Sequence, residues 1–405
     1  MPDPADLADR QLVLDRERTS RFPNLFTRKL QRMSTSPLAF LRGAAPLFYE
    51  LMKERPDLAD GPPGEGWIVG DLHLENFGAY RPDPTAKGAA KIAAVFNLND
   101  FDDTLIAPWR FDVLRLTTSL LLGGRELGAS GFVALELVDR LLESWARSAF
   151  DGAPLPAEPP PVKALVEQVR SRSKTALLDA RTKLHGGKRR FVRGPRYAEL
   201  DEETLDAVPK AFEDYVAGLP KDIRKDKKAF SIKDAAFRIA GTGSLGGLRI
   251  AVLVAGKGDT SGMWIFDMKE QGDPSASLLL GTPDMVPAER VATGFRQAVD
   301  RPARMIGCTH LKKMSMFVRR LAPQEDKLDL RSLKPGDLPA LATYLGALLG
   351  AAHARAATKV PHRWSRSDLG ELRERAIHLA GIHEAVYLAL CDRMREVLPP
   401  TAVTA

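Results

Sequence analysis

The sequence predicts an α+β protein in which helical regions flank a β-rich stretch near residues 236–320. Three observations carry this prediction. Apolar residues recur at helical spacing on both sides of the stretch, they alternate or form β-branched blocks within it, and 405 residues are too many for one compact core. We therefore expect two lobes, a small β-rich lobe and a helical lobe that both flanks build.

Helices and two short strands are expected up to residue 150. Ser36 and Pro37 supply an N-cap and a first-turn proline, after which apolar residues recur at helical spacing. A break rich in glycine and proline precedes the first strand, and an acidic cluster follows the second. The expected elements are a helix over 38–52, strands over 67–69 and 92–96, and helices over 111–122 and 132–150.

The second half of the chain begins with a linker. Gly152–Pro161 contains five prolines, and a basic segment with a short helical stretch to about Lys228 follows it. Beyond it, apolar β-branched runs and two-faced alternation indicate strands. The expected elements are strands over 248–254 and 264–269 and helices over 339–357 and 369–397.

Composition excludes several classes of protein. Charged residues at 27% and hydrophobic residues at 44% exclude wholesale disorder. Two cysteines, Cys308 and Cys391, cannot form a disulfide framework, and no CxxC spacing indicates zinc. The chain starts with neither a basic nor an apolar leader, and its longest apolar stretch, 339–352, is too short to cross a bilayer. We expect a cytoplasmic protein with no membrane partner.

The net charge of +7 comes from one local patch. Between Lys163 and Arg196 stand eleven lysines and arginines against only Glu167 and Asp179. Such a patch can attract a phosphate-bearing partner through its electric field, or it can be a solvated face. No aromatic-interleaved RNA motif accompanies segment 163–196.

The sharpest chemical signal is Gly70-Asp-Leu-His-Leu-Glu-Asn-Phe-Gly78. Phosphoryl transfer needs a carboxylate that positions the acceptor hydroxyl and an amide oxygen that reaches a metal. The catalytic loop of kinases supplies both with the spacing that Asp71 and Asn76 have here. Further along, Asn99-Asp-Phe-Asp-Asp103 follows a strand and offers Asp100 as a ligand for Mg²⁺. The competing interpretation is a pair of strand-end loops with Asx turns.

A glycine-rich segment, Gly241-Thr-Gly-Ser-Leu-Gly246, is the second signal. A dinucleotide-binding glycine turn would open a helix, yet strand-like residues lie on both sides of this segment. A strand, a glycine turn and a strand form the hairpin that covers nucleotide phosphates in kinases. The nucleotide-binding candidates here are Gly241, Gly243, Ser244 and Gly246.

Lys269, at the end of a predicted strand, is placed to reach nucleotide phosphates. It needs a carboxylate partner from a helix, and Glu289 at the head of a plausible helix is our choice. Glu270 is nearer in sequence, but adjacent strand residues face opposite ways. A solvated surface lysine is the alternative for Lys269 taken alone.

With these motifs the sequence resembles a bacterial family of uncharacterised proteins in the protein-kinase-like superfamily, near aminoglycoside and choline kinases. Further matches are Met33-Ser-Thr-Ser-Pro-Leu-Ala-Phe-Leu-Arg-Gly43, Glu289–Arg296 and Ala352–Arg355, so the resemblance spans roughly residues 20–360. It implies a kinase-like fold and nucleotide binding. It also implies that Asp112 braces the catalytic loop from a helix, while His353 is expected to be structural.

The motif order departs from that of ordinary kinases, because here the glycine turn and lysine follow the catalytic aspartate. A circular permutation explains this order. The metal-site tripeptide, Asp100-Phe-Asp102, lacks the glycine of protein kinases, so Asp102 or Asp103 can share the metal. His73 stands where aminoglycoside-type kinases often carry histidine, and it serves either the γ-phosphate or a loop-bracing hydrogen bond.

The sequence thus predicts a circularly permuted, protein-kinase-like enzyme that uses ATP and Mg²⁺ to phosphorylate a hydroxyl. A small-molecule acceptor is expected, because little chain separates Asp100 from the helix at Asp112 and a peptide-docking segment has no room. The alternatives are a non-catalytic ATP-binding regulator and a nucleotidyl transferase acting on protein. Five parts are expected along the chain. They are an N-terminal helical segment (1–66), the catalytic-loop and metal-site part (67–150), a proline-rich linker with a basic helical insertion (151–230), the nucleotide-binding lobe (231–322) and the C-terminal helices (323–405).

Overall fold

The computed structural model describes residues 3–83, 94–173 and 175–397. Of these residues, 51% are helical and 17% lie in strands, which confirms the α+β prediction. Residues 92–93 of the second expected strand and Lys174 of the basic segment lie outside the described residues. Within the described ranges, no helix has the length and apolar character needed to cross a membrane.

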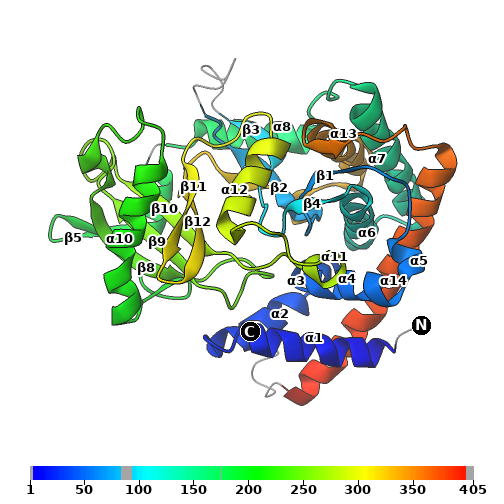
Figure 1. Cartoon of the computed structure of the whole chain (residues 1–405), viewed down its shortest axis with the longest axis horizontal. Helices are drawn as coiled ribbons and strands as arrows, with labels where there is room; N and C mark the ends of the chain where they lie inside the picture. Colours follow the sequence, from blue (N-terminus) through cyan, green and yellow to red (C-terminus); the bar gives the residue numbers. More distant parts are fainter. Residues whose placement is uncertain (1–2, 84–93, 174, 398–405) are drawn as a thin grey trace.

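Helices fill one side of the molecule, on the right in Figure 1. The helix expected over 38–52 is divided at Ala44, and the second piece begins with Pro46 in its first turn, where a missing N–H costs nothing. In chain order the α-helices are α1 (Pro4–Arg18), α2 (Asn24–Met33), α3 (Pro37–Gly43), α4 (Ala45–Glu54), α5 (Pro56–Ala59), α6 (Arg110–Glu126), α7 (Gly131–Asp151), α8 (Pro160–Ser171), α9 (Ala176–Arg181), α10 (Glu202–Gly218), α11 (Ser277–Leu280), α12 (Pro287–Ala298), α13 (Leu338–Arg355) and α14 (Arg366–Val397).

A six-stranded antiparallel sheet fills the opposite side, with the strand order β11-β12-β10-β9-β8-β7. Smaller sheets, β14-β1-β4 and β13-β2-β3, lie between this sheet and the helices. The strands are β1 (Glu65–Ile68), β2 (Phe77–Tyr80), β3 (Val95–Leu98), β4 (Leu105–Pro108), β5 (Thr182–His185), β6 (Lys188–Phe191), β7 (Tyr197–Ala198), β8 (Ile232–Arg238), β9 (Arg249–Val254), β10 (Trp264–Glu270), β11 (Ile306–Leu311), β12 (Met314–Leu321), β13 (Asp326–Lys327) and β14 (Ala357–Lys359).

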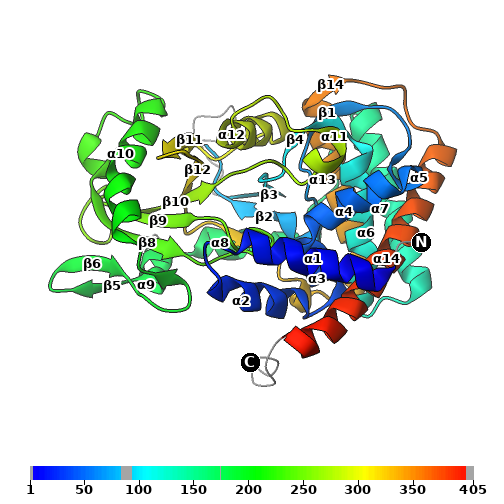
Figure 2. The same cartoon turned by 60° about the horizontal axis from the view of Figure 1, so that its bottom comes forward.

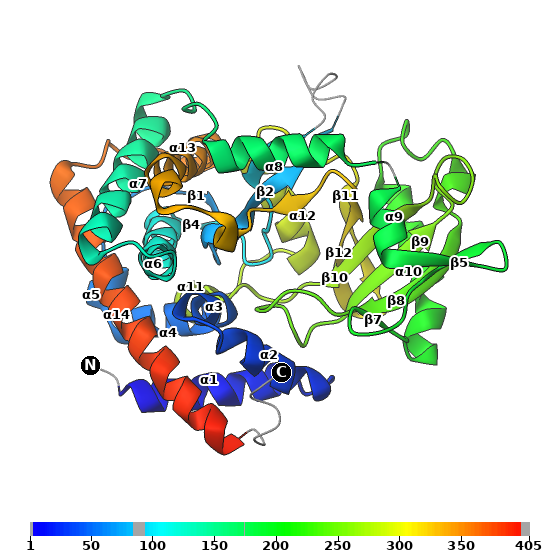
Figure 3. The same cartoon turned by 180° about the vertical axis from the view of Figure 1, so that it is seen from behind.

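Both faces of the six-stranded sheet are covered at β9, which explains why this strand is a continuous apolar run in the sequence. Val252 belongs to the core cluster that Phe212 and Tyr215 of α10 share. Leu253, on the other face, packs with Leu178 of α9. Segment 151–230, expected as a basic helical insertion, therefore covers the sheet with helices and also contributes β7 to it. Its hairpin β5–β6 projects at the far edge in Figure 3.

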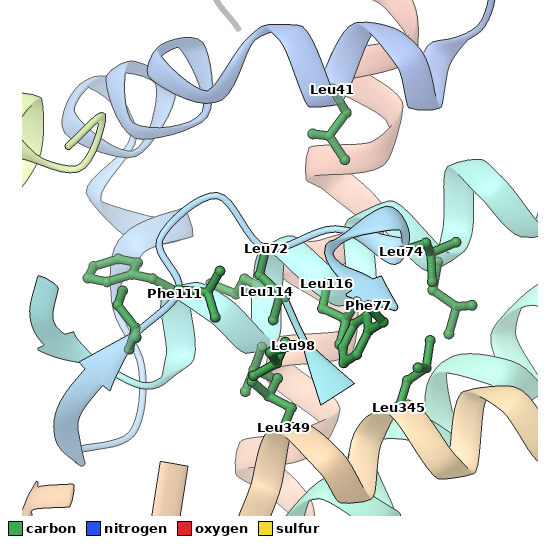
Figure 4. Close-up of a cluster of buried hydrophobic side chains, with 14 of the residues drawn as sticks. Leu41, Leu72, Leu74, Phe77, Leu98, Phe111, Leu114, Leu116, Leu345 and Leu349 are labelled. Atoms are coloured by element: carbon green, nitrogen blue, oxygen red, sulfur yellow. The ribbon is translucent and has the colours of Figure 1, made fainter. Parts of the chain in front are cut away.

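The segment after β1 rests on a hydrophobic core that helices from distant parts of the chain supply. Figure 4 shows Leu72, Leu74 and Phe77 gathered with side chains of α6 and with Leu345 and Leu349 of α13. All of these side chains are buried. The carboxyl-terminal helices therefore fix the position of a loop that lies near the start of the chain.

The N-terminal helical pair, α1 with α2, joins the two sides of the molecule (Figure 2). Toward the helical side, Arg393 of α14 donates to Asp9 with an Nε–Oδ1 distance of 2.9 Å. Toward the sheet, the Phe22 ring stacks on Phe237 of β8 with centroids 4.6 Å apart. The pair thus spans from α14 to the start of the glycine-rich segment.

Candidate active site

The loop that follows β1 is anchored to α6. Both carboxylate oxygens of Asp112 accept hydrogen bonds from backbone amides, Val69 at 2.7 Å and Gly70 at 2.9 Å. Trp145 donates from Nε1 to Nδ1 of His353 at 3.1 Å, and because indole can only donate, Nε2 of His353 carries its proton toward Asp112. Asp112 therefore braces the loop, and His353 is structural, as the sequence predicts.

Asp71 leaves this loop with its carboxylate held by Arg115, a fully buried side chain on α6. Arg115 donates from Nε to Oδ1 at 2.8 Å and from Nη2 to the Leu41 carbonyl at 2.8 Å. Burial raises the pKa of Asp71 to about 7; Asp103 and Asp100 add to the rise, while Arg115 opposes it. A carboxylate with this pKa can accept a proton at neutral pH.

His73 and Asn76 lock the turn η1 (Leu74–Asn76) with reciprocal hydrogen bonds. Nδ1 of His73 accepts from the Glu75 amide at 3.1 Å, and Oδ1 of Asn76 accepts from the His73 amide at 2.8 Å. Burial, with the nearby Arg42 guanidinium, lowers the pKa of His73 well below its ordinary value. Of the two roles left open for His73, its observed contacts serve the loop-bracing one, and the Asn76 oxygen keeps a second lone pair for a ligand.

In the acidic loop between β3 and β4, residues 99–104, the aspartate side chains contact different partners. Asp102 pairs with Lys269 and accepts a hydrogen bond from Gln271 at 2.9 Å. Lys327 places Nζ 3.9 Å from Oδ2 of Asp100, and the Asp100 side chain is 39% exposed. Burial alone would raise the pKa of Asp100, but the Lys269 and Lys327 ammonium groups outweigh it and hold this pKa below its ordinary value. Asp100 is therefore the better placed of the two to take a metal.

The expected pairing of Lys269 with Glu289 is not formed. Lys269 contacts Asp102 instead, and Glu289 lies on the exposed face of α12. The neighbouring Arg290 is the buried residue of this turn, and its Nη2 donates to the carbonyls of Asp102 at 3.0 Å and Gly272 at 2.9 Å. Because α12 packs its apolar face on β11 and β12, residue 289 is turned to solvent. Glu270, the other candidate, pairs with Arg21.

The glycine-rich segment joins two antiparallel strands, β8 and β9, as expected. Gly241 and Gly246 have φ angles of +83° and +109°, which side chains with a Cβ rarely adopt. The Ser244 hydroxyl lies over Gly241, where an added Cβ would be 2.5 Å from Oγ. At Gly243 an added Cβ would lie 3.8 Å from Oδ2 of Asp71. The turn therefore reaches down to the catalytic candidate.

One cavity of about 330 Å³ brings the candidates together. Its floor carries the carboxylates and Lys269, its roof is the glycine-rich segment, and Glu289 takes no part in it. Lys327 of β13 also lines this cavity. It was not predicted, because nothing in the sequence indicates that β13 pairs with β2 beside the acidic loop. The candidate residues that line the cavity are Asp71, His73, Asn76, Asp100, Asp102, Gly241, Gly243, Ser244, Gly246 and Lys269.

The donor atoms of this cavity suit Mg²⁺ bound together with a phosphate. Magnesium usually takes one or two protein oxygens and completes its octahedron with water and phosphate oxygens. Asp100 and Asn76 offer such oxygens on one wall. Among the described residues, no three histidine, cysteine, aspartate or glutamate side chains group as a self-sufficient metal site.

A second cavity of about 290 Å³ meets the first at Lys269. Buried ion pairs line it: Asp267 is 2% exposed and lies 2.7 Å from Nη1 of Arg238, while Arg249 donates to the same carboxylate from Nε at 2.9 Å. Burial would raise the pKa of Asp267, but the two guanidinium groups lower it strongly. Arg319 also lines this cavity and pairs with Glu325 at 3.3 Å, so arginines and carboxylates line it together.

Fold and site together define an α+β protein with a charged cavity between a glycine-rich hairpin and two acidic loops. The chain belongs to a bacterial family whose model, described as "Uncharacterized protein conserved in bacteria (DUF2252)", matches residues 21–393. No curated protein and no solved structure matches it.

Proposed function

We propose that this protein is an ATP- and Mg²⁺-dependent phosphotransferase with a circularly permuted, kinase-like fold of two lobes. The observation that carries the proposal is the single cavity in which Asp71, Asn76 and Asp100 meet Lys269 and the glycine-rich segment. These residues lie far apart in the sequence, and their order along the chain is reversed relative to kinases. Meeting in one cavity is what the chemistry requires, whatever the order.

The arrangement around the six-stranded sheet supports the permuted kinase fold. A glycine turn between β8 and β9, a lysine on β10, and then α12 packed on β11 and β12 follow the order of a kinase nucleotide lobe. The helical side holds the loop with Asp71 through Asp112. The pairing of Lys269 with Asp102 is the feature that departs from this pattern.

Asp71 acts on the acceptor. Its carboxylate accepts a hydrogen bond from the acceptor hydroxyl, whose oxygen forms a bond to the γ-phosphorus as the bond between that phosphorus and the β–γ bridging oxygen breaks. The hydroxyl proton passes to Asp71 and then to solvent, and ADP leaves. Arg115 keeps the carboxylate in one orientation.

Lys269 and the glycine-rich segment hold the phosphates. The ammonium group pairs with Asp102 and also lowers the pKa of Asp100, and the residues of the turn line the same cavity. Asp100 and Asn76 are the residues that would hold Mg²⁺, which when bound neutralises charge that develops on the phosphate oxygens.

We expect ATP with Mg²⁺ to raise the melting temperature. A ligand that binds only the native state stabilises it by about 2.7 kcal/mol at a hundredfold excess over Kd. Lys269→Ala should lose most of the shift, whereas Lys233→Ala, an exposed lysine of β8, should keep it. Differential scanning fluorimetry measures both, and an equal shift in Lys269→Ala would remove the assigned role. Binding without turnover on any acceptor would favour a non-catalytic regulator.

The second cavity, which arginines line together with carboxylates, supports one other candidate function, nucleotidyl transfer. A nucleotide base placed there would meet these ion pairs. Terminal phosphates would instead meet Arg238, Arg249 and Arg319, whose present partners are the carboxylates of Asp267 and Glu325. In that orientation the acceptor oxygen bonds to the α-phosphorus and pyrophosphate leaves.

Parallel incubations with α-labelled and γ-labelled ATP, with Asp71→Asn as the inactive control, distinguish the two reactions. Label from the γ position in a small-molecule product supports phosphoryl transfer. Label from the α position in protein supports nucleotidyl transfer.

A further inference from the structure

We infer that the acceptor is an anion, a hydroxyl compound carrying a phosphate or carboxylate group, and that Arg42 recognises its charge. This inference rests on the proposed function, because the inference names the class of acceptor that would bind at Asp71. It concerns a wall of the cavity that none of the predicted catalytic, nucleotide or metal residues occupies.

The N-terminal wall of the cavity is cationic. Residues 18–45 contribute Arg18, Arg21, Arg42, Gly43 and Ala45 to the lining, so within the described chain this wall holds three arginines and no carboxylate. Arg21 is matched by Glu270 across the cavity. The roof formed by residues 241–247 carries no ionisable side chain that could balance the others.

Arg42 supplies part of this positive charge. Its Nη1 donates to Glu75 at 2.6 Å, and its Nε is buried with no hydrogen-bond partner in the described structure. Burial lowers the pKa of Lys327 and of His73. The Asp100 carboxylate opposes this for Lys327, while the charge of Arg42 lowers both pKa values further. Glu75 is thus the carboxylate that Arg42 contacts, and the buried Nε of Arg42 is a donor left for a ligand that accepts hydrogen bonds.

Arg42 and Asp71 flank the same point of the glycine-rich turn. An added Cβ at Gly243 would lie 3.1 Å from the Arg42 carbonyl and 3.8 Å from Oδ2 of Asp71. Only the Arg42 backbone is placed by this distance, but the Arg42 residue lines the same cavity as Asp71. A compact acceptor with its hydroxyl at Asp71 can thus direct its charged group toward the Arg42 guanidinium. A cationic acceptor of the aminoglycoside or choline kind would meet like charge at this wall, which disfavours placing its cationic group there.

The test measures binding of glycerol 3-phosphate by calorimetry, with glycerol as the uncharged control. The protein is first saturated with a non-hydrolysable ATP analogue and Mg²⁺. We expect glycerol 3-phosphate to bind and glycerol not to bind, and Arg42→Gln to weaken the anion about tenfold while changing analogue affinity less than about twofold. Arg16→Gln is the matched control, because Arg16 lies on α1 but packs over the Phe26 ring, 5.2 Å from its centroid.

Equal binding of glycerol and glycerol 3-phosphate would overturn the inference. A loss of analogue affinity in Arg42→Gln as large as the loss for the anion would also overturn it, since the arginine would then serve the nucleotide. If the analogue does not bind the wild-type protein, the proposed function fails. In that case, titration of the protein without nucleotide with glycerol 3-phosphate and with glycerol tests separately whether the cavity prefers an anion.

Discussion

Arg115 and Asp71 form a pair in which the cation is wholly buried and the carboxylate is 19% exposed toward the cavity. The buried partner fixes the direction of the carboxylate, and the exposed edge stays available to a ligand. Burial pushes the pKa of Asp71 up to about 7, while the guanidinium limits that rise. At the scale of single residues, this balance sets the proton affinity of the site.

Phosphate transfer should therefore depend on pH through Asp71. The carboxylate is protonated below pH about 7 and cannot accept the hydroxyl proton, so the rate should rise with pH across this value. Arg115→Gln removes the opposing cation and should move the rise to higher pH, whereas Arg115→Lys should move it less. Initial rates with γ-labelled ATP and a metabolite pool give the profiles. An unchanged midpoint in Arg115→Gln would contradict the assignment.

Single motifs could be predicted from the sequence, but their partners could not. The spacing of Asp71 and Asn76 was accessible because it depends on one short segment. The bracing role of Asp112, which joins distant segments, was implied by the family resemblance. Arg115 lies three residues beyond Asp112 on the same helical face, and that spacing was the available signal. The link from Lys269 to Asp102 joins distant segments, and no periodicity encodes such a contact.

Helix α12 is the element that ties the sheet to the acidic loop, and Arg290 is its anchor. The Arg290 side chain is 1% exposed and donates to backbone carbonyls of residues 102, 104 and 272. Carbonyls buried without a donor are costly. The helix therefore holds the loop that carries Asp102 in a fixed place relative to β12.

Arg290→Met should lower the free energy of unfolding by about 3 kcal/mol, because it leaves these carbonyls unsatisfied. Glu289→Gln, one position away on the exposed face, should change it by less than about 0.5 kcal/mol. Urea unfolding followed by circular dichroism compares the two. Equal losses would contradict the anchoring role, and loss of the ATP-dependent thermal shift in Glu289→Gln would indicate that α12 turns toward Lys269 when nucleotide binds.

At the level of elements, strongly patterned segments were predicted well. The helices expected over 111–122 and 132–150 correspond to α6 and α7, because long apolar faces determine them. The hairpin β5–β6 was missed, since its basic residues hide the alternation of a strand. Its turn, Gly186-Gly187, has both φ angles positive and was the signal that could have revealed it.

The N-terminal helical pair holds the two sides of the molecule in register, and a buried charge pair connects its helices. Asp15 of α1 and Lys29 of α2 form an ion pair with both side chains fully buried. Burial lowers the pKa of Lys29, and Asp15 opposes this. Because Arg18 and Arg21 follow directly along the chain, the cationic wall of the cavity depends on this pair for its position.

Lys29→Met should destabilise the whole protein by about 3–5 kcal/mol, because it leaves the Asp15 charge buried and unpaired. The double variant Asp15→Leu with Lys29→Met should recover most of this loss, since two apolar side chains need no partner. Chemical unfolding of the wild type and the variants gives the comparison. A double variant less stable than Lys29→Met would contradict this account.

The packing of α13 beneath the loop of Asp71 also has a consequence for biosynthesis. His353, Leu345 and Leu349 are translated long after the loop of Asp71 that they support. The nascent chain therefore contains this loop without the α13 side chains that pack beneath it until synthesis is nearly complete. Contacts of such large sequence separation slow folding, because a long loop must close before they form. A chain released before residue 338 would hold Asp71, Asn76 and Asp100 but not the core beneath them, so premature termination should leave apolar surface exposed.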